Sequence, residues 1–229
     1  KRGRNMPVAG DDRRAMTMIA YVGGEYDVCG NKWYGSNVAN RERGLPRSIH
    51  SITLNDPETG APLAMCSGNL VSAMRTGAVP GLATRYLKSD SASVVGIIGA
   101  GVINRAALIA ICESLENVEL VKIYNRTAAK AEALCRELSE ETGICMTAVS
   151  SAEEAIKGSD VISVATSGGQ PVIIEDEWIK KGALIHLVGT ASLSEDMYIN
   201  SRVVVDNWSM HLDWIDDGMR HPDGIESLM

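Results

Sequence analysis

The sequence predicts an α/β fold with a doubly wound parallel sheet, and three observations support this prediction. From about residue 91 to residue 207, short apolar runs alternate with helical patterns, as they do in βαβ units with right-handed crossovers. The first run, residues 94–98, is rich in β-branched residues, which is typical of a strand covered on both faces. A glycine-rich turn follows this run directly and opens a helix.

The residues before about 90 contain many turns, and two elements stand out among them. Residues 51–54 and 62–65 flank a polar turn that ends in a glycine, which predicts a β-hairpin. Over residues 69–88 apolar side chains recur at helical spacing, so this stretch predicts one helix or a pair of helices. Pro80 and Gly81 lie inside it, and we expect a kink or an interruption there.

The alternating part of the chain supplies the remaining elements. Each predicted strand is a short apolar run, and each predicted helix shows apolar residues three or four positions apart. The predicted strands are residues 94–98, 119–124, 146–149, 160–165, 183–188 and 202–205. The predicted helices are residues 104–115, 128–141 and 152–157.

Composition and charge exclude several classes of protein. The chain has 229 residues, of which 22 are Lys or Arg and 29 are Asp or Glu, and its net charge is -7. This acidic balance argues against a nucleic-acid binder, and the 45% hydrophobic content argues against disorder. No apolar run approaches the roughly 18–20 residues that span a membrane. The five cysteines form no CxxC pair, so we expect reduced thiols, no metal site and a cytoplasmic location.

The turn Gly99-Ala100-Gly101 has the context of a Rossmann-type dinucleotide-binding motif. Gly99 allows the tight turn, and Gly101 lets the backbone approach a pyrophosphate at the helix N-terminus. The third position of the motif usually holds a small residue, but here it is Asn104. We therefore expect the helix to lie slightly farther from the strand or to start differently.

The residues after the second predicted strand bear on the choice between NAD and NADP. An Asp or Glu at this point binds the ribose 2′-hydroxyl in NAD enzymes. This chain has Asn125-Arg126-Thr127 instead. The guanidinium of Arg126 and the hydroxyl of Thr127 could hold a 2′-phosphate, so the sequence favours NADP(H) over NAD(H). The alternative is that Arg126 is a solvated loop charge.

Further cofactor contacts are expected at the same edge of the sheet. In doubly wound sheets, ligands lie outside the carboxyl ends of the strands. The fourth and fifth predicted strands end there in small polar loops, either of which could also be a simple turn. Beyond the glycine turn and residues 125–127, the expected cofactor contacts are Val102, Ile103, Thr166, Ser167, Val188 and Gly189.

Several short motifs before residue 90 follow one another in a fixed order. They are Lys32-Trp33-Tyr34, Gly44-Leu45-Pro46-Arg47, Leu54-Asn55-Asp56, Thr59-Gly60-Ala61-Pro62 and Met74-Arg75-Thr76-Gly77-Ala78. Together with the later glycine turn, they resemble the ornithine cyclodeaminase/mu-crystallin family. The resemblance covers roughly residues 15–206, and its most specific part is the Arg-Thr-Gly-Ala element before the dinucleotide motif.

The resemblance implies a fold and an activity. Its members join a Rossmann-type domain to an α+β domain that binds substrate and forms a homodimer, and they use NAD(H) or NADP(H) on small amino or imino acids. On this basis residues 1–90 are the substrate-binding and dimerisation domain, residues 91–207 the NAD(P)-binding domain, and residues 208–229 the start of a C-terminal return segment. The chain is shorter than the family's two-domain chain, so we expect segments of the first domain and of the C-terminal part to be missing.

The resemblance also implies roles for particular residues. Arg75 corresponds to the family arginine that clamps the substrate carboxylate, which a guanidinium can bind with two hydrogen bonds. Lys32 corresponds to the family lysine at the substrate, where it could stabilise charge or move a proton. The alternative for both is a surface charge. Arg4 is a further candidate for the carboxylate, and Thr76 is a candidate for the cofactor.

The chain departs from the cyclodeaminase pattern after the fifth predicted strand. Cyclodeaminases carry a catalytic Asp directly after a Val-Gly pair, whereas here Val188-Gly189 leads into Thr190 and Ala191. We therefore favour an oxidoreductase of the C–N bond, of the ketimine reductase, pyrroline-carboxylate reductase or amino-acid dehydrogenase type. One alternative is an ornithine cyclodeaminase, whose activity Ala191→Asp should raise. The other is a non-catalytic protein that binds NADPH or another small molecule, as mu-crystallin-like members do.

Two other features have structural interpretations. Glu195 and Asp196 are expected at the start of a capped helix. His186 lies in the middle of the fifth predicted strand, and we interpret it as a core histidine with a hydrogen-bond partner.

Overall fold

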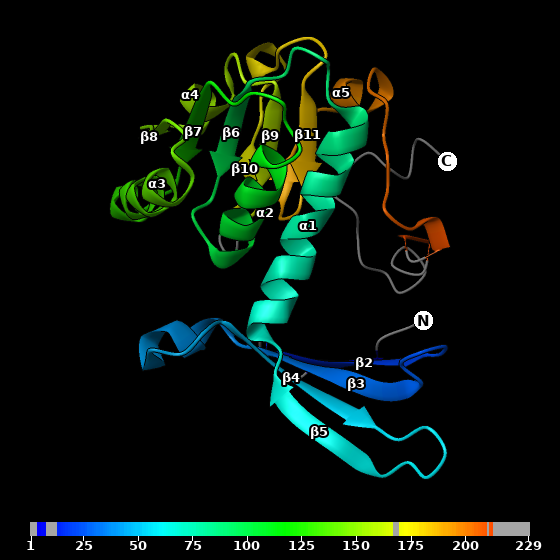
Figure 1. Ribbon diagram of the computed structural model, residues 1–229. Coiled ribbons are helices and arrows are strands. Elements are labelled where there is room, and N and C mark those ends of the chain that lie inside the picture. The colour runs from blue at the N-terminus through cyan, green and yellow to red at the C-terminus, as the bar shows by residue number, and fades with distance from the viewer. Residues whose placement is uncertain (1–3, 8–12, 167–169, 210, 213–229) are drawn as a thin grey trace. The chain divides into compact units, whose positions relative to one another are not determined.

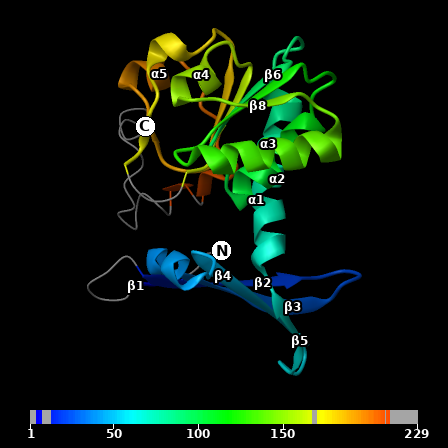
Figure 2. The same ribbon diagram turned by 90° about the vertical axis from the view of Figure 1, so that its left-hand side faces the viewer.

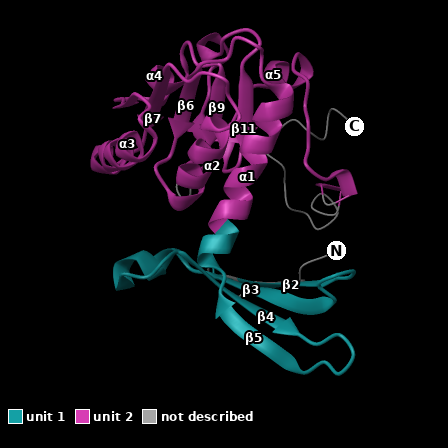
Figure 3. Ribbon diagram, in the orientation of Figure 1, with its two compact units in different colours: residues 1–72 teal, residues 73–229 magenta. Residues whose placement is uncertain are grey.

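The computed structural model describes residues 4–7, 13–166, 170–209 and 211–212 (Figure 1). The chain divides into two compact units, residues 1–72 and residues 73–229 (Figure 3). The division falls inside helix α1 (Asn69–Leu87), whereas the sequence pattern placed the change of domain after residue 90. Each unit is built on a sheet of its own.

Unit 1 contains one antiparallel sheet of five strands in the order β1-β2-β3-β4-β5. The sequence pattern did not predict its first three strands. β2 is apolar along most of its length and β3 contains two glycines, so neither shows the alternation that marks a half-buried strand. The elements are β1 (Arg4–Pro7), β2 (Arg14–Val22), β3 (Val28–Ser36), the short helix η1 (Val38–Arg43), β4 (Ser48–Asn55) and β5 (Pro62–Ser67).

The hairpin of β4 and β5 confirms the prediction made for residues 51–65. Asp56 closes its turn, because its carboxylate accepts hydrogen bonds from the backbone N–H and from the hydroxyl of Thr59, at 2.7 Å each. Gly60 adopts φ +74°, a left-handed conformation that favours glycine. Local side chains hold this turn, which is why its sequence alone was sufficient to predict it.

Helix α1 continues without interruption through Pro80, so the predicted interruption is wrong. Close packing against a second helix of unit 2, α2 (Val102–Cys112), accounts for this. A Cβ added at Gly77 would lie 2.5 Å from the backbone nitrogen of Ala107, and one at Gly81 would lie 2.5 Å from Cβ of Ala110. Contacts on both sides of Pro80 therefore hold α1 in helical form despite the lost hydrogen bond.

Unit 2 contains a parallel sheet with helices on both faces, which confirms the predicted doubly wound α/β fold. The strand order is β11-β9-β6-β7-β8, so the chain starts in the middle, moves to one edge and returns to build the other half. The strands are β6 (Val94–Ile98), β7 (Leu120–Tyr124), β8 (Met146–Ala148), β9 (Val161–Val164) and β11 (Leu184–Leu187). Beside α1 and α2, the helices are α3 (Ala128–Thr142) and α4 (Ala152–Ile156).

The predicted sixth strand, residues 202–205, is wrong. These residues are irregular and pair with no strand in the part of the chain that the structure describes. Val203 and Val204 are 45% and 55% exposed. A β-branched run forms a strand only where a neighbouring strand and a covering layer are available to it, and here neither is supplied.

Two apolar clusters pack on opposite faces of the unit 2 sheet. Ile97 belongs to a cluster with residues of α2 and α3, while Ile98 belongs to a cluster with residues of α4. Figures 1 and 2 show these helices beside the sheet. Neighbouring residues of a strand point to opposite faces, so one buried strand supplies both clusters. Gly96 fits close packing on the α4 side, because a Cβ there would lie 2.3 Å from the carbonyl oxygen of Ala155.

The last described elements of unit 2 are short. β10 (Val172–Ile173) pairs in parallel with β12 (Ala191–Ser192), and η2 (Asp176–Trp178) lies between β10 and β11 in the chain. Helix α5 (Glu195–Ile199) begins as predicted, and the hydroxyl of Ser194 caps it by accepting from the N–H of Met197 at 3.0 Å. Among the helices of the described ranges, none has the length and apolar character needed to cross a membrane.

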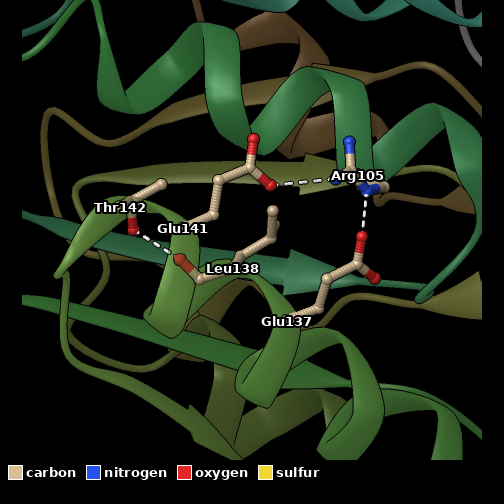
Figure 4. Close-up of polar contacts among 5 residues, drawn as sticks. All are labelled: Arg105, Glu137, Leu138, Glu141 and Thr142. Atoms are coloured by element: carbon tan, nitrogen blue, oxygen red, sulfur yellow. Dashed lines mark hydrogen bonds and ion pairs between the residues drawn. The ribbon is translucent and has the colours of Figure 1, made fainter.

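Arg105 braces α2 against α3 in unit 2 (Figure 4). Its Nε donates to Glu137 at 2.7 Å and its Nη2 donates to Glu141 at 2.9 Å. The two glutamates lie one turn apart on α3, so one guanidinium reaches both. Beside them, the hydroxyl of Thr142 donates to the backbone carbonyl of Leu138 at 2.6 Å, near the end of the helix.

Candidate functional site

The carboxyl ends of four parallel strands meet along one edge of the unit 2 sheet. Ile98 of β6 pairs with Tyr124 of β7 and with Val164 of β9, and Val164 pairs with Leu187 of β11. The segments that follow these residues therefore line the same edge. We call them the strand-end loops: the glycine turn at residues 99–101, residues 125–127, residues 165–166 and residues 188–190.

The glycine turn has one crowded residue and one open residue. Gly99 adopts φ +102°, and a Cβ there would lie 2.7 Å from the carbonyl oxygen of Ala165. Gly101 is exposed and forms the N-cap of α2 without any side-chain cap. A Cβ at Gly101 would meet nothing within 4 Å. The first turn of α2 therefore presents its backbone N–H groups to open space, which is an arrangement that can receive an anion.

The side chain of Asn104 lies beneath this turn and is completely buried. Its Nδ2 donates to the carbonyls of Ile98 and Gly99, at 2.9 and 2.7 Å, and its Oδ1 accepts from the hydroxyl of Ser163 at 2.9 Å. The helix that follows starts at Val102, two residues before the predicted start at 104. The amide thus bridges helix and strand where the usual small residue allows direct backbone packing.

The loop after β7 is tied to the glycine turn through Asn125. The side-chain oxygen of Asn125 accepts from the N–H of Ala100 at 3.1 Å, and its Nδ2 donates to the carbonyl of Thr127 at 2.9 Å. Arg126 and Thr127 are exposed. Residues 125–127 contain no carboxylate, and the guanidinium of Arg126 is the charged group of this loop.

The loops after β9 and β11 pack tightly on each other. A Cβ at Gly189 would lie 2.7 Å from both the backbone nitrogen and the carbonyl oxygen of Thr166. The hydroxyl of Thr166 donates to the carbonyl of Thr190 at 3.2 Å. Ser167, which the sequence placed at the cofactor, lies outside the described residues, while Val188 is half-buried beside Gly189.

Thr190 and Ala191 differ sharply in their surroundings. Thr190 is exposed at the rim of the strand-end loops. Ala191 is 2% exposed and packs in β12 within the cluster that contains Ile98 and Ile162. The sequence could not distinguish these two positions, and of the two only Thr190 has an exposed side chain. The substitution Ala191→Asp is therefore the wrong test of the missing carboxylate, because it would bury the charge in an apolar cluster.

Lys32 lies at the centre of β3 in unit 1, opposite Met18 of β2 and Ile52 of β4, and it is half-buried. Side chains alternate along a strand, so Lys32 shares its face of the sheet with Tyr34. The cross-strand neighbour of Tyr34 is His50, and the two ring centroids are 4.9 Å apart. Lys32 therefore lies between two apolar neighbours, Met18 and Ile52, on the face of the unit 1 sheet that also carries Tyr34 and His50.

The sequence pattern gave His50 no role at this face. Its Nδ1 lies 3.4 Å from Oδ1 of Asn69, and its Nε2 lies 3.3 Å from Oγ of Ser72. Both partners lie in the first turn of α1, so His50 fastens the start of that helix to the sheet. Only the pairing of Tyr34 with His50 across β3 and β4 could have revealed this group, because the two residues are distant in sequence.

The remaining predicted site residues belong to separate parts of the chain. Arg75 is exposed and Thr76 is half-buried, and both lie in the part of α1 that belongs to unit 2. Arg4 lies in β1 of unit 1, where its backbone alone is described. The structure thus brings the cofactor candidates of the strand-end loops together within unit 2, and it places Lys32 within unit 1.

His186 has the structural role that the sequence predicted. It is buried in β11, and its Nε2 lies 2.9 Å from the hydroxyl of Thr84 on α1. Burial lowers the pKa of His186 to about 4, so its imidazole is neutral at pH 7. In the described ranges, no three His, Cys, Asp or Glu side chains gather as a metal-binding group.

Comparison with known proteins gives consistent matches. A profile of the ornithine cyclodeaminase/mu-crystallin family matches residues 4–210. Over 199 residues the chain is 34% identical to N-((2S)-2-amino-2-carboxyethyl)-L-glutamate dehydrogenase of Staphylococcus aureus, a match that covers 86% of this chain and 59% of that protein. The chain thus spans about three-fifths of the length of this curated relative.

Two solved structures resemble the fold closely. One is Delta(1)-pyrroline-2-carboxylate reductase of Thermococcus litoralis in complex with NADH and L-proline, with a TM-score of 0.80 and 36% identity over 90% of this chain and 64% of that chain. The other is an archaeal alanine dehydrogenase dimer with bound NAD, with a TM-score of 0.79 and 28% identity over 99% of this chain and 70% of that chain.

Proposed function

The chain belongs to the ornithine cyclodeaminase/mu-crystallin family, and from this premise we propose that it is an NAD(P)-dependent oxidoreductase of the C–N bond. Its substrate would be a small amino or imino acid. The observation that carries the proposal is the meeting of the strand-end loops at the open, uncapped start of α2. The relatives compared above support it, since they are named as two dehydrogenases and one reductase of amino or imino acids.

The strand-end loops fit a dinucleotide. The pyrophosphate would lie at the glycine turn, where the exposed Gly101 leaves space and the N–H groups of Val102 and Ile103 begin the helix. The adenosine ribose would lie at residues 125–127. The nicotinamide half would lie against Thr166, with Ser167, Val188, Gly189 and Thr76 as the other expected contacts. This order follows the usual path of a dinucleotide along the carboxyl ends of the strands.

We assign the reaction steps to Lys32 and Arg75. When bound, the nicotinamide ring would supply the hydride for the carbon of a C=N bond, or accept it in the reverse direction. Arg75 would hold the substrate carboxylate through two hydrogen bonds. Lys32 would stabilise the charge that develops at the nitrogen and give a proton to it, so that C=N becomes CH–NH. In the oxidative direction Lys32 would take that proton back.

We infer a preference for NADP(H) over NAD(H). The exposed guanidinium of Arg126 and the hydroxyl of Thr127 can both meet a 2′-phosphate. The carboxylate that would favour a free ribose is replaced by Asn125, whose oxygen is already engaged with the N–H of Ala100. The two similar structures hold NADH and NAD, and titration of this chain with NADH and NADPH tests the preference.

We also propose a homodimer, with residues 1–90 as the part that binds substrate and forms the interface, and residues 91–207 as the part that binds NAD(P). The sheet of unit 1 exposes large apolar side chains, which monomeric proteins rarely gather on one element. They are Met18, Ile19, Tyr21, Val22, Trp33, Ile49, Leu54, Leu63 and Met65. Light scattering coupled to gel filtration would measure the mass. A cytoplasmic location stays a prediction.

An assay of NAD(P)H oxidation tests the activity directly. The protein would be mixed with NADPH or NADH and with a panel of cyclic and linear imino acids, and the absorbance of the reduced nicotinamide would be followed. Loss of absorbance with at least one imine is the expected result. Arg75→Lys keeps the charge but not the two-pronged geometry, so it should raise KM for the imine more than KM for the nucleotide.

Two other outcomes of this panel would identify a different function. Ammonia release from ornithine without net reduction of the nucleotide would indicate a cyclodeaminase. Tight binding of NADPH with no turnover on any amino or imino acid would indicate a non-catalytic binding protein. Thr190 stands where a cyclodeaminase is expected to carry its carboxylate, so we favour the oxidoreductase over the first of these.

A further inference from the structure

The glycine turn is held from inside the fold by the amide group of Asn104. Its Nδ2 carries two hydrogens and donates to the carbonyls of two successive residues, Ile98 and Gly99. Its single oxygen accepts from the hydroxyl of Ser163 on β9. Asn104 and Ser163 are both 0% exposed, so water does not compete for these groups. The amide therefore makes three short buried hydrogen bonds at one point, and its Nδ2 also lies 3.5 Å from the backbone carbonyl oxygen of Ser163.

The hydrogen bonds to the glycine turn depend on having Asn104, rather than the usual small residue, at the third motif position. A glycine or alanine at the third position has no side-chain donor, so it cannot serve the carbonyl of Gly99. On its other side Gly99 is confined by β9, since a Cβ would lie 2.7 Å from the carbonyl oxygen of Ala165. Gly99 thus lies between the backbone of Ala165 and the side-chain amide of Asn104.

A second asparagine holds the middle of the same turn. Oδ1 of Asn125 accepts from the N–H of Ala100, and Nδ2 of Asn125 donates to the carbonyl of Thr127. The two asparagines therefore engage three successive residues of the backbone, 98–100. Gly101 is the next residue, and it leads into open space and into α2.

We propose that Asn104, anchored by Ser163, is a positioning residue for the dinucleotide. It sets the direction of the glycine turn and hence of the N–H groups of α2 that would receive the pyrophosphate, without touching the nucleotide itself. The inference rests on the proposed function, because it requires that the glycine turn bind NAD(P)(H). At the third motif position, the hydrogen-bonded amide of Asn104 takes the place of the small residue that usually allows close packing of helix and strand.

The physical reason is that binding at a helix start depends on direction. Backbone N–H groups bind an anion well only when they point to it at hydrogen-bonding distance. If the Asn104 amide is removed, the carbonyl of Ile98 keeps the N–H of Ala165 as a donor, but the carbonyl of Gly99 loses this buried donor. The turn can then rotate so that this carbonyl recovers a donor from water or from another group. The N–H groups beyond Gly101 would rotate with it. The sheet itself is held by its own strand pairing and should stay intact.

Four variants separate positioning from simple stability. Asn104→Ala and Asn104→Gly restore the usual small residue but remove every hydrogen bond of the amide. Ser163→Ala leaves the amide in place and removes only the hydroxyl that donates to its oxygen. The matched control is Ser159→Ala, because Ser159 is also 0% exposed in unit 2 and donates through its hydroxyl to a backbone carbonyl, that of Ala155 at 2.7 Å.

The main measurement is direct binding of NADPH and of NADH by titration calorimetry, with thermal unfolding of the nucleotide-free protein as the second readout. We expect about tenfold weaker binding for both variants of Asn104, the size of effect that one lost buried hydrogen bond produces. For Ser163→Ala we expect roughly threefold weaker binding, on the same scale. Ser159→Ala should lower the unfolding temperature about as much as Ser163→Ala and leave binding unchanged. In the assay, KM for the nucleotide should rise while kcat and KM for the imine change little.

Wild-type binding by folded Asn104→Gly or Asn104→Ala would overturn the proposal, since a small residue would then serve equally well. If neither variant folds, Ser163→Ala decides, and binding equal to that of Ser159→Ala overturns it. A wild-type protein that binds NADPH but turns over no imine contradicts the proposed reaction alone. A wild-type protein that binds neither nucleotide refutes both the proposed function and this inference.

Discussion

The hydroxyl oxygen of Thr84 lies 2.9 Å from Nε2 of His186, and this contact joins α1 to β11 across 102 positions of sequence. Thr84 is 0% exposed and His186 is 8% exposed. β11 leads directly into residues 188–190 of the strand-end loops, so the contact fastens α1 to the strand that carries part of the candidate site. It also places a titratable group in the interior of unit 2.

We expect stability to fall between pH 6.5 and pH 4 because of His186. Burial lowers its pKa from 6.5 to about 4, so in this window the unfolded chain takes up a proton that the folded chain does not. Above pH 6.5 both states are neutral and the effect vanishes, and below pH 4 the loss is complete. The full shift corresponds to a loss of about 3 kcal/mol in the free energy of unfolding. Urea unfolding at pH 7, 5.5 and 4 measures it.

The control for this pH effect is His186→Gln, which keeps a polar side chain for Thr84 and cannot titrate. Its free energy of unfolding should depend less on pH over the same window, even if the variant is less stable at pH 7. An equal loss for wild type and variant would assign the acid sensitivity to other groups.

Asp160 should govern stability at more acidic pH. Burial alone would raise its pKa, but hydrogen bonds from Lys180 and from the backbone N–H groups of Ser93 and Val94 lower the pKa of this carboxyl. Its contribution is therefore present above its ordinary pKa and is lost as the pH falls through the lowered value. Asp160→Ala should cost about 2–4 kcal/mol at pH 7, because two backbone donors at the start of β6 lose their acceptor.

Lys180→Met is the comparison for Asp160. The lysine side chain is 51% exposed, whereas that of Asp160 is 6% exposed. Removing the lysine should therefore cost about 1 kcal/mol or less, well below the cost of removing the carboxylate. Similar losses in chemical denaturation for the two variants would show that the backbone hydrogen bonds of Asp160 contribute little.

Thr190→Asp and Ala191→Asp should differ in stability although they are neighbours. Thr190 is exposed, so Thr190→Asp should change the free energy of unfolding by only about 0.5 kcal/mol. Ala191 is 2% exposed in an apolar cluster, so Ala191→Asp should cost roughly 3 kcal/mol or more. Thermal unfolding of both variants checks this order. A well-folded Ala191→Asp would contradict the burial of β12.

Thr190→Asp also tests whether a missing carboxylate explains the difference between this chain and the cyclodeaminases. If a missing carboxylate is the sole difference, Thr190→Asp should release ammonia from ornithine at a rate above that of the wild type. No gain in ammonia release by a folded Thr190→Asp variant would show that further residues separate the two activities.

Arg126→Ala should weaken the binding of NADPH about tenfold or more and leave NADH almost unchanged, because only the first carries a phosphate for the guanidinium. Arg136→Ala is the matched control, since Arg136 is also exposed but lies on α3 away from its start. Both substitutions change the net charge equally. Fluorescence titration with the two nucleotides measures the ratio. An equal loss for NADH and NADPH would refute the assignment of Arg126 to the 2′-phosphate.

The elements that could be predicted are those whose causes are local. The hairpin after Asn55 follows from Asp56 and Gly60, which form the turn by themselves. The alternation of strands and helices after residue 91 follows from apolar periodicity, and five of the six strands that it predicted form the parallel sheet. The glycine turn at 99–101 can be located in the same way, because it lies between an apolar run and a helical pattern.

The elements that could not be predicted depend on partners that are distant in sequence. Helix α1 continues through Pro80 because Gly77 and Gly81 pack against α2. Residues 202–205 have the composition of a strand but no strand beside them in the described part of the chain. β2 and β3 form because nine residues of each pair with the other strand in antiparallel register, although neither strand shows a clear alternation of apolar and polar residues.

The sequence by itself determined the fold class of unit 2, the place of the glycine turn and the family, because hydrophobic period, turn chemistry and motif order are all local properties. The tertiary structure alone decided that Asn104 supports that turn, that Thr190 is exposed while Ala191 is buried, and that His50 lies beside Tyr34. Each of these depends on which distant backbone lies within hydrogen-bonding or packing distance. That is set by strand register and helix packing, which no short stretch of sequence encodes.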